Sequence, residues 1–191
     1  RRSSDLYHRY LNIKKEDPKW EDRDRFILSK GHAGIAYAPV LCDFGYNDPE
    51  QLKTFNLTNS KMGIHLDSNK VAGVDASTGS LGHGIPIAAG TAIAARVLGK
   101  DYYTYVVTGD GELDEGSNWE GLMTIRHYNL TNCITIVDRN HCMIDGNTED
   151  VMKLEPLADK FVAFGFHTIV CEGNNIVSLC KAIDEAHKTK E

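Results

Sequence analysis

Two short apolar runs separated by one helix-length segment constrain the fold of this chain more than any other feature. The run "YYTYVVT" (102–108) is aromatic and β-branched and predicts a strand. The run "CITIVD" (133–138) is continuously apolar, as in strands buried on both faces of a parallel sheet. Between them, "GSNWEGLMTIRHYN" (116–129) has the apolar spacing of an amphipathic helix. A strand, a helix and a strand in this order indicate a parallel pair joined by a crossover.

The rest of the chain extends the alternation. We expect a helix over "LEPLADKFVAFG" (154–165), a strand over "FHTIVC" (166–171) and a final helix over "NIVSLCKAIDEAHK" (175–188). The predicted fold is therefore α/β, a parallel sheet with helices on both faces. The first half adds a short apolar run at 26–29, helices at 30–45, 48–55 and 82–99, and a long loop from 60 to 81 of the kind that is often functional.

Composition favours a single domain and excludes some classes of partner. The 191 residues are 41% hydrophobic and 25% charged, which suits one sizeable core spanning residues 1–191. The net charge is −6 and no basic stripe interleaved with aromatics occurs, so nucleic acid is not an expected partner. An anionic ligand would have to be held by local features of its site.

Cysteine usage and hydropathy indicate a cytoplasmic protein with no membrane partner. The five cysteines are odd in number and form no C-x-x-C pair, which argues against a disulfide framework or a zinc site. No signal peptide is evident, and the most apolar long stretch, 84–99, is too short to span a bilayer and contains Arg96.

Polar residues follow both central strands. Asp110 comes directly after the strand that ends at Thr108, and Asn140 follows the strand that ends near Asp138. Because ligands of parallel α/β sheets bind at the carboxyl ends of the strands, both side chains should meet at one edge. A carboxylate, an amide oxygen and nearby carbonyls suit Mg²⁺, which would let Asp110 anchor a diphosphate that it would otherwise repel. A solvated G-D-G turn is the alternative for that tripeptide taken alone.

Longer blocks of the sequence resemble a known family. A G-D-G followed about thirty residues later by Asn resembles the thiamin diphosphate signature. The blocks "DRDRFILSKGHAGIAYAPVL", "ASTGSLGHGIPIAAGTAIAARV", "GDGELDEGSNWEG" and "VDRNHCMIDGNTE" resemble the amino-terminal half of a transketolase. They are most similar to the short subunit of split transketolases, from Asp22 to about Ala186. The resemblance implies a single thiamin-diphosphate-binding domain, the one that grips the diphosphate.

The resemblance also implies roles for residues around the cofactor. It gives Mg²⁺, for which Ca²⁺ or Mn²⁺ may substitute, three ligands: Asp110, Asn140 and the backbone carbonyl of Cys142. Gly111 and Asn140 would contact the diphosphate. The turn formed by Gly79, Ser80 and Leu81 would contact the aminopyrimidine and thiazolium region.

Three further side chains acquire expected roles in this way. His32 would line the cofactor and substrate cleft, and His65 would face the reacting substrate. Glu115 would lie near the interface between paired active sites. His83 stands where the family often has glutamine, and either contacts the cofactor or caps the helix that begins there. Glu112 and Asp114 are interpreted as carboxylates favoured at a helix N-terminus.

The implied activity is transfer of a two-carbon ketol unit from a ketose phosphate to an aldose. The resemblance implies a partner subunit that carries the activating glutamate, an α2β2 heterotetramer, and no activity of this chain alone. The family has a G-H-P-G motif upstream of "DRDRF" and a T-x-K-G-x-G segment after the last helix. Neither is in the sequence, so we expect segments to be missing at both ends.

Alternatives remain at this point. "IHLD" in place of the family's G-H-P leaves the donor and acceptor sugars open, and an enzyme for a sulfonated or branched ketose would have the same motifs. Another thiamin diphosphate enzyme is a second alternative, either a deoxyxylulose-phosphate synthase or an α-keto-acid dehydrogenase component. A nucleotide-binding module is disfavoured because no G-x-G-x-x-G or P-loop is present. A non-catalytic paralogue is disfavoured because Asp110 and Asn140 are both intact.

Overall fold

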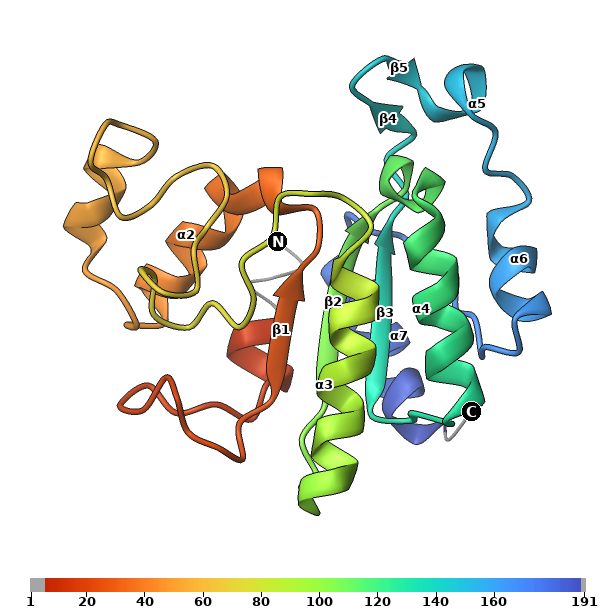
Figure 1. Cartoon of the computed structure of the whole chain (residues 1–191), viewed down its shortest axis with the longest axis horizontal. Helices are drawn as coiled ribbons and strands as arrows, with labels where there is room; N and C mark the ends of the chain where they lie inside the picture. The colour runs from red at the N-terminus through yellow and green to blue at the C-terminus, as the bar shows by residue number, and fades with distance from the viewer. Residues whose placement is uncertain (1–5, 190–191) are drawn as a thin grey trace.

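A computed structural model describes residues 6–189 of the protein (Figure 1). Three parallel strands form the sheet at the centre of the fold. They are β1 (Arg25–Leu28), β2 (Thr104–Gly109) and β3 (Cys133–Asp138), in the spatial order β1-β2-β3. The predicted domain limits at 1 and 191 lie outside the described residues. Both β2 and β3 were predicted as strands, and a helical crossover joins this parallel pair, as expected.

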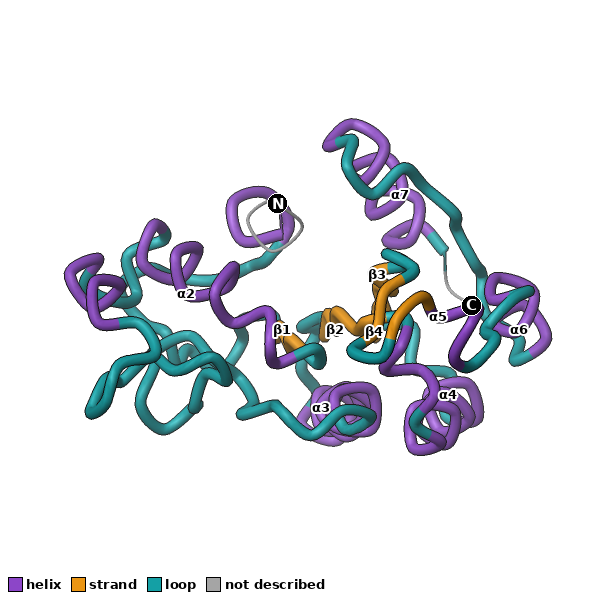
Figure 2. Tube along the Cα trace, turned by 90° about the horizontal axis from the view of Figure 1, so that it is seen from above, coloured by secondary structure: helices purple, strands orange, loops and turns teal. Residues whose placement is uncertain are grey.

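Helices cover both faces of the sheet, which confirms the predicted fold class. The helices α3 (Gly84–Leu98) and α4 (Gly116–His127) lie side by side on one face. The short N-terminal helix η1 (Leu6–Tyr10) and α7 (Ile176–Lys188) lie on the other face (Figure 2). Small residues on α3 let it approach the strands closely. Ala88, Ala92 and the rest of that helix's inner face are buried.

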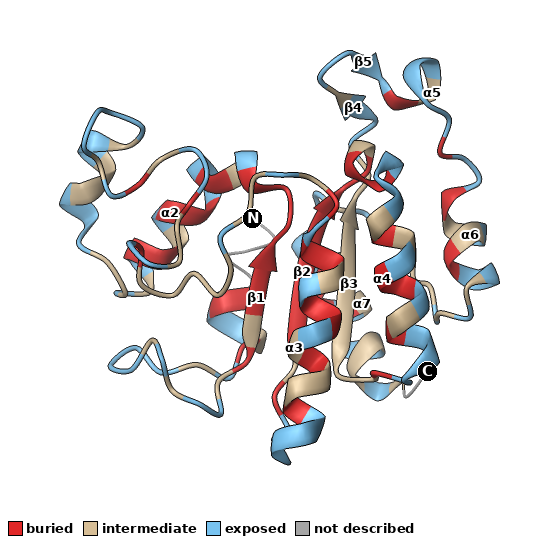
Figure 3. Cartoon of the chain, in the orientation of Figure 1, coloured by how far each residue is buried: buried red, intermediate tan, exposed pale blue. Residues whose placement is uncertain are grey.

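The strands differ in burial, which corrects one expectation. Every residue of β2 is buried, whereas every residue of β3 is only half-buried (Figure 3). The sequence predicted that β3 is buried on both faces. In the described part of the chain β3 is the last strand of its sheet, so its continuous apolar run reaches the edge of the core instead of its centre.

The predicted strand at 166–171 is wrong. These residues have no regular structure, and Val170 is 82% exposed. Strand propensity reflects packing on a pleated, half-buried surface, and this segment pairs with no described strand. Phe166 instead packs edge-on against Phe161 of α6 (Leu157–Ala163), with 6.3 Å between ring centroids.

The first half of the chain follows its local sequence signals. The 3-10 turn η2 (Gly31–Ala33) leads into α2 (Gly34–Asp43), and residues 60–81 form the expected irregular loop. Asp48 caps the 3-10 helix η3 (Pro49–Thr54), since its side chain accepts from the backbone N–H of Glu50.

The connection after β3 lies over the carboxyl ends of the strands. A small antiparallel hairpin, β4 (Cys142–Met143) and β5 (Gly146–Asn147), leads into the short helix α5 (Thr148–Val151) at the top of Figure 1. The 3-10 helix η4 (Gly111–Asp114) follows β2 at the same edge. Within residues 6–189, no helix has the length and apolar character needed to cross a membrane.

Candidate active site at the carboxyl edge of the sheet

The carboxylate of Asp110 is the buried centre of this edge. Its residue follows β2 directly and is 1% exposed. Oδ1 accepts from the backbone N–H of Gly111 at 2.8 Å. Oδ2 accepts from the backbone N–H of His141 at 2.7 Å and from the Arg139 guanidinium at 2.8 Å. Hydrogen bonds thereby connect the turn after β2 to the loop after β3. The sequence predicted that these two segments meet at one edge of the sheet.

The other two predicted metal ligands lie in that same loop. The amide oxygen of Asn140 accepts from the backbone N–H of Cys142 at 2.9 Å. A Cβ placed on Gly111 would lie 2.8 Å from the Cβ of Met143 and 3.8 Å from the carbonyl oxygen of Cys142. Only glycine fits at position 111. The 3.8 Å distance places the Cys142 carbonyl beside the turn that carries Asp110.

The donor chemistry of these three residues fits a hard cation. They offer a carboxylate, an amide oxygen and a main-chain carbonyl, the ligand types that Mg²⁺ shares with phosphate oxygens. Within residues 6–189, no group of three or more His, Cys, Asp or Glu side chains is arranged to hold a metal ion. Of the three predicted ligands, only Asp110 would bind the metal through a side chain of these four types, because Asn140 offers an amide and Cys142 its backbone carbonyl.

A cleft of about 580 Å³ opens next to the long loop. Gly79 and Ser80 of the predicted turn contribute to its wall, whereas Leu81 is half-buried and does not line it. The full lining is Ser77, Thr78, Gly79, Ser80, His83, Pro86 and Ile87.

Both predicted histidines lie around Gly79. A Cβ on Gly79 would be 3.3 Å from the imidazole of His65, and a Cβ on Gly31 would be 2.9 Å from the backbone nitrogen of Gly79. Gly31 precedes His32, so the two histidine-bearing loops meet at the same turn. Both imidazoles are exposed.

The charge state of His32 is shifted towards neutral. Partial desolvation of this mostly exposed ring lowers its pKa below the ordinary 6.5, the Lys30 ammonium and His65 lower the pKa further, and the carboxylate of Glu112 opposes the change. A neutral imidazole can donate from one nitrogen and accept at the other.

His83 and Glu115 complete the predicted set. His83 occupies the N-cap position of α3, but its side chain makes no capping hydrogen bond and instead lines the cleft. Glu115 precedes α4 and is exposed. Gly82 has φ of +86°, and a Cβ there would lie 2.6 Å from the Cβ of Glu115, so Glu115 packs against the end of the cleft turn.

The sequence interpretation missed the importance of Glu112. This side chain lies in the first turn of η4, as expected of a helix N-terminal carboxylate, but it is 3% exposed. It accepts from the Thr108 hydroxyl at 2.7 Å and from the Ser29 hydroxyl. It also accepts from the backbone N–H groups of Gly82 and Gly109, each at 3.1 Å. Glu112 therefore joins the loops after β1 and β2 to the cleft turn.

Two cations were also missed. Lys30 follows β1 closely and its ammonium donates to Asp138 of β3 at 2.8 Å, so the pair crosses the end of β2. Arg139 follows β3 and donates to Asp110. Polar residues placed directly after buried strands were the available signal, and it was applied to Asp110 and Asn140 only.

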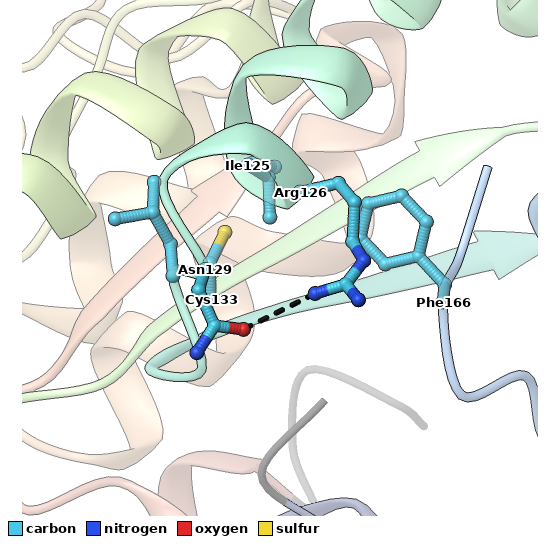
Figure 4. A pocket seen from close by; sticks show the side chains of 6 residues that line it. Ile125, Arg126, Asn129, Cys133 and Phe166 are labelled. Carbon is cyan, nitrogen blue, oxygen red and sulfur yellow. Dashed lines mark hydrogen bonds between the residues drawn. The ribbon is translucent and has the colours of Figure 1, made fainter.

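A second hollow lies at the opposite end of the sheet, where α4 ends and β3 begins. Figure 4 shows Arg126 donating to the side chain of Asn129 there, at 3.3 Å, beside Cys133 and Phe166. Its volume is about 20 Å³, which is room for roughly one water molecule. It is too small for a substrate, so the carboxyl edge remains the candidate site.

Comparison with known proteins defines the class of this site. Residues 2–191 match the family described as "Transketolase, thiamine diphosphate binding domain". The chain is 42% identical over 179 residues to an apulose-4-phosphate transketolase subunit of Actinobacillus succinogenes, covering 94% of this chain and 65% of that protein. It is 38% identical to the 6-deoxy-6-sulfo-D-fructose transketolase subunit SqwG of a Clostridium species, covering 97% of this chain and 67% of that protein.

A solved structure agrees with these relatives. A transketolase from Leishmania mexicana superposes with a TM-score of 0.93 at 38% identity, over 98% of this chain and 30% of that one. The fold is that of a thiamin diphosphate-binding domain. The chain belongs to the transketolase family, as its motifs predicted, and spans about two thirds of the length of the two transketolase subunits that it resembles.

Proposed function

We propose that this chain holds the diphosphate end of thiamin diphosphate, through Mg²⁺, in a transketolase composed of two kinds of subunit. The observation that carries the proposal is that the loop after β3, which holds Asn140 and Cys142, is hydrogen-bonded to Asp110 and lies against the turn of Gly111. The reaction is transfer of a two-carbon ketol unit from a ketose phosphate to an aldose. The domain is a single one, and the absence of a disulfide among its described cysteines suits a cytoplasmic location.

The residues of this chain bind and orient. Asp110, Asn140 and the Cys142 carbonyl would hold the metal, for which Ca²⁺ or Mn²⁺ could substitute, and Gly111 and Asn140 would contact the diphosphate. Thiamin diphosphate, when bound, supplies the nucleophilic carbon that carries the two-carbon unit. Gly79, Ser80 and Leu81 provide the turn against its rings.

The two histidines act on the sugar side of the cleft. His32, with its lowered pKa, is neutral near pH 7 and serves as a hydrogen-bond donor or acceptor to cofactor or substrate oxygens. His65 faces the substrate and can hold or move a proton at a sugar hydroxyl. Glu115, exposed at the start of α4, lies at the interface between paired active sites.

A second chain is part of the proposal. Three relatives are named as transketolase subunits, which supports a partner, and the proposed assembly is an α2β2 heterotetramer in which the partner supplies the activating glutamate. The sugar specificity is the open choice. Relatives named for apulose-4-phosphate and for 6-deoxy-6-sulfo-D-fructose favour a branched or sulfonated ketose as a second candidate donor.

Two measurements test the proposed function. Calorimetric titration of the full-length protein with thiamin diphosphate should give binding with Mg²⁺ and little without it. Ketol transfer should appear only after the partner subunit is added, and a panel of ordinary, branched and sulfonated ketoses should identify the donor. Binding that is indifferent to Mg²⁺, or transfer by this chain alone, would contradict the proposal.

A further inference from the structure

Arg139 makes a complete set of hydrogen bonds at the edge of the candidate metal site. Nε donates to Glu155 at 3.1 Å, and one terminal nitrogen donates to Asp110 at 2.8 Å and to Thr148 at 2.6 Å. The other terminal nitrogen donates to Glu149 at 2.6 Å and again to Glu155 at 2.9 Å. A guanidinium has five N–H donors, so each has a partner.

Apart from Asp110, these partners all lie in the segment 148–155, which fixes the guanidinium independently of Asp110. Thr148 is fully buried at the start of α5, and Glu149 is next to it. Glu155 lies just before α6, where its carboxylate also accepts from the backbone N–H of Leu157 at 2.8 Å. The segment after the β4–β5 hairpin thus holds the planar fork of Arg139 in place.

The fork in turn fixes the carboxylate of Asp110. Oδ2 receives two donors, from Arg139 and from the backbone of His141, which matches its two lone pairs. Oδ1 receives one donor, from the backbone of Gly111, and keeps one lone pair for another ligand. Rotation of the carboxylate would break charge-assisted bonds, which are roughly twice as strong as neutral ones.

We propose that Arg139 is a positioning residue of the metal site, which holds Oδ2 of Asp110 so that Oδ1 is presented to Mg²⁺. This inference rests on the proposed function. The single positive charge of Arg139 is shared among the carboxylates of Asp110, Glu149 and Glu155, so this group keeps a net negative charge that favours a cation. The site is therefore coupled to the segment 148–155, and Asp110 would bind the metal through Oδ1 alone.

The same contact has an opposite interpretation, in which Arg139 occupies the place of the metal and competes with it. The two interpretations predict opposite signs. If Arg139 positions Asp110, its removal weakens Mg²⁺ binding. If Arg139 competes with the metal, its removal strengthens Mg²⁺ binding.

The experiment is a Mg²⁺ titration of the full-length protein with its partner subunit, at fixed thiamin diphosphate, followed by tryptophan fluorescence or calorimetry. In Arg139→Gln we expect the apparent Kd for Mg²⁺ to rise by about 10–100-fold, the usual cost of losing a partner of a metal ligand. Arg139→Lys keeps the positive charge, so its apparent Kd for Mg²⁺ should rise less than that of Arg139→Gln. Glu155→Gln keeps the bond to Asp110 and should stay within about threefold of the wild type.

Controls separate this defect from general damage. Arg126→Gln removes a charge and one hydrogen bond at the far end of the sheet, and should leave the Kd for Mg²⁺ unchanged. In Arg139→Gln, saturating Mg²⁺ should restore thiamin diphosphate affinity to within about threefold, a recovery that a damaged fold would not show. If Arg139→Gln unfolds at a much lower temperature than the wild type, the test uses Arg139→Lys instead. A rise of about tenfold in the Kd of Arg139→Lys for Mg²⁺ then supports the inference.

The outcomes that overturn the inference are distinct from failure of the proposed function. A Kd for Mg²⁺ that is unchanged in Arg139→Gln and Arg139→Lys would remove the positioning role. A lower Kd would show that Arg139 competes with the metal. If the wild-type protein itself shows no Mg²⁺-dependent binding of thiamin diphosphate, the proposed function fails first.

Discussion

Two polar networks flank the G-D-G turn, and they are built differently. On the side of β1, the buried carboxylate of Glu112 accepts from hydroxyls and main-chain N–H groups, all of them uncharged donors. On the side of β3, the guanidinium of Arg139 donates to the buried carboxylate of Asp110 and to the more exposed carboxylates of Glu149 and Glu155. The first network joins loops to the core, and the second orients one side chain.

The difference has a physical consequence for each network. A buried carboxylate satisfied by neutral dipoles is expensive to disturb, because each donor left unpaired loses its solvation. A charged network with exposed members is weakened by salt and by protonation, and contributes less to stability. We therefore expect changes around Glu112 to act on the fold, and changes around Arg139 to act on ligand binding.

The largest expected effect is that of Glu112→Ala. It leaves the donors of Ser29, Gly82 and Gly109 unpaired inside the protein, while the Thr108 hydroxyl can still donate to the Gly109 carbonyl at 3.2 Å. An unsatisfied buried donor costs about 1–3 kcal/mol. We expect the free energy of unfolding to fall by about 3 kcal/mol or more, measured by urea denaturation. Glu115→Ala, at an exposed carboxylate three residues on, is the matched control and should be nearly neutral.

A smaller effect is expected from one hydroxyl of that network. Thr108→Val removes the donor to Glu112 at 2.7 Å and should cost about 1 kcal/mol. Thr104 lies on the same strand and is equally buried, but its hydroxyl has no hydrogen-bond partner among the described residues. Thr104→Val should therefore be neutral or stabilising. Equal losses in the two variants would show that the Glu112 network adds nothing to stability.

The hydrogen bonds of Arg139 should make the stability of the protein depend on pH. The backbone N–H of Leu157 and then the Arg139 guanidinium lower the pKa of Glu155 from its ordinary 4.5. The folded state therefore binds a proton at Glu155 less tightly than the unfolded state does. The contribution of ionised Glu155 to the free energy of unfolding is present above pH 4.5 and is lost as pH falls through the folded pKa. The loss should be a shift of about 1 °C in Tm, absent in Glu155→Gln and reduced in 1 M salt. A loss of the same size in Glu155→Gln would assign it to another group.

The smallest effect concerns His32, which lies in the turn after β1. Its pKa is lowered by partial desolvation and by Lys30, so its ring should titrate below pH 6.5 in NMR spectra. The neutral form is favoured in the folded state, so the linked stability is present above pH 6.5 and declines below it. Lys30→Gln should raise the pKa, whereas Lys53→Gln, on the distant helix η3, should not. A pKa of His32 that ignores Lys30→Gln would contradict the stated cause.

The sequence allowed prediction of the parts of the fold that local signals determine. The runs of β2 and β3 and the periodic helix between them were readable, and so was the placement of Asp110 and Asn140 at one edge. The strand at 166–171 was not, because apolar and β-branched residues do not reveal whether a pairing partner exists. Glu112 and Arg139 were missed because their partners are distant in sequence and are brought together only by the strand order.

The central claim is that Asp110 holds Mg²⁺ against the diphosphate, and calorimetry of Asp110→Asn tests it most directly. The substitution keeps the size of the side chain, but its amide cannot accept from all three donors of Asp110, so the melting temperature of the cofactor-free protein should fall by several degrees with the fold retained. We predict that Mg²⁺-dependent binding of thiamin diphosphate weakens by about 100-fold or more, since the charge that balances the cation is lost. Wild-type affinity in Asp110→Asn would contradict the account.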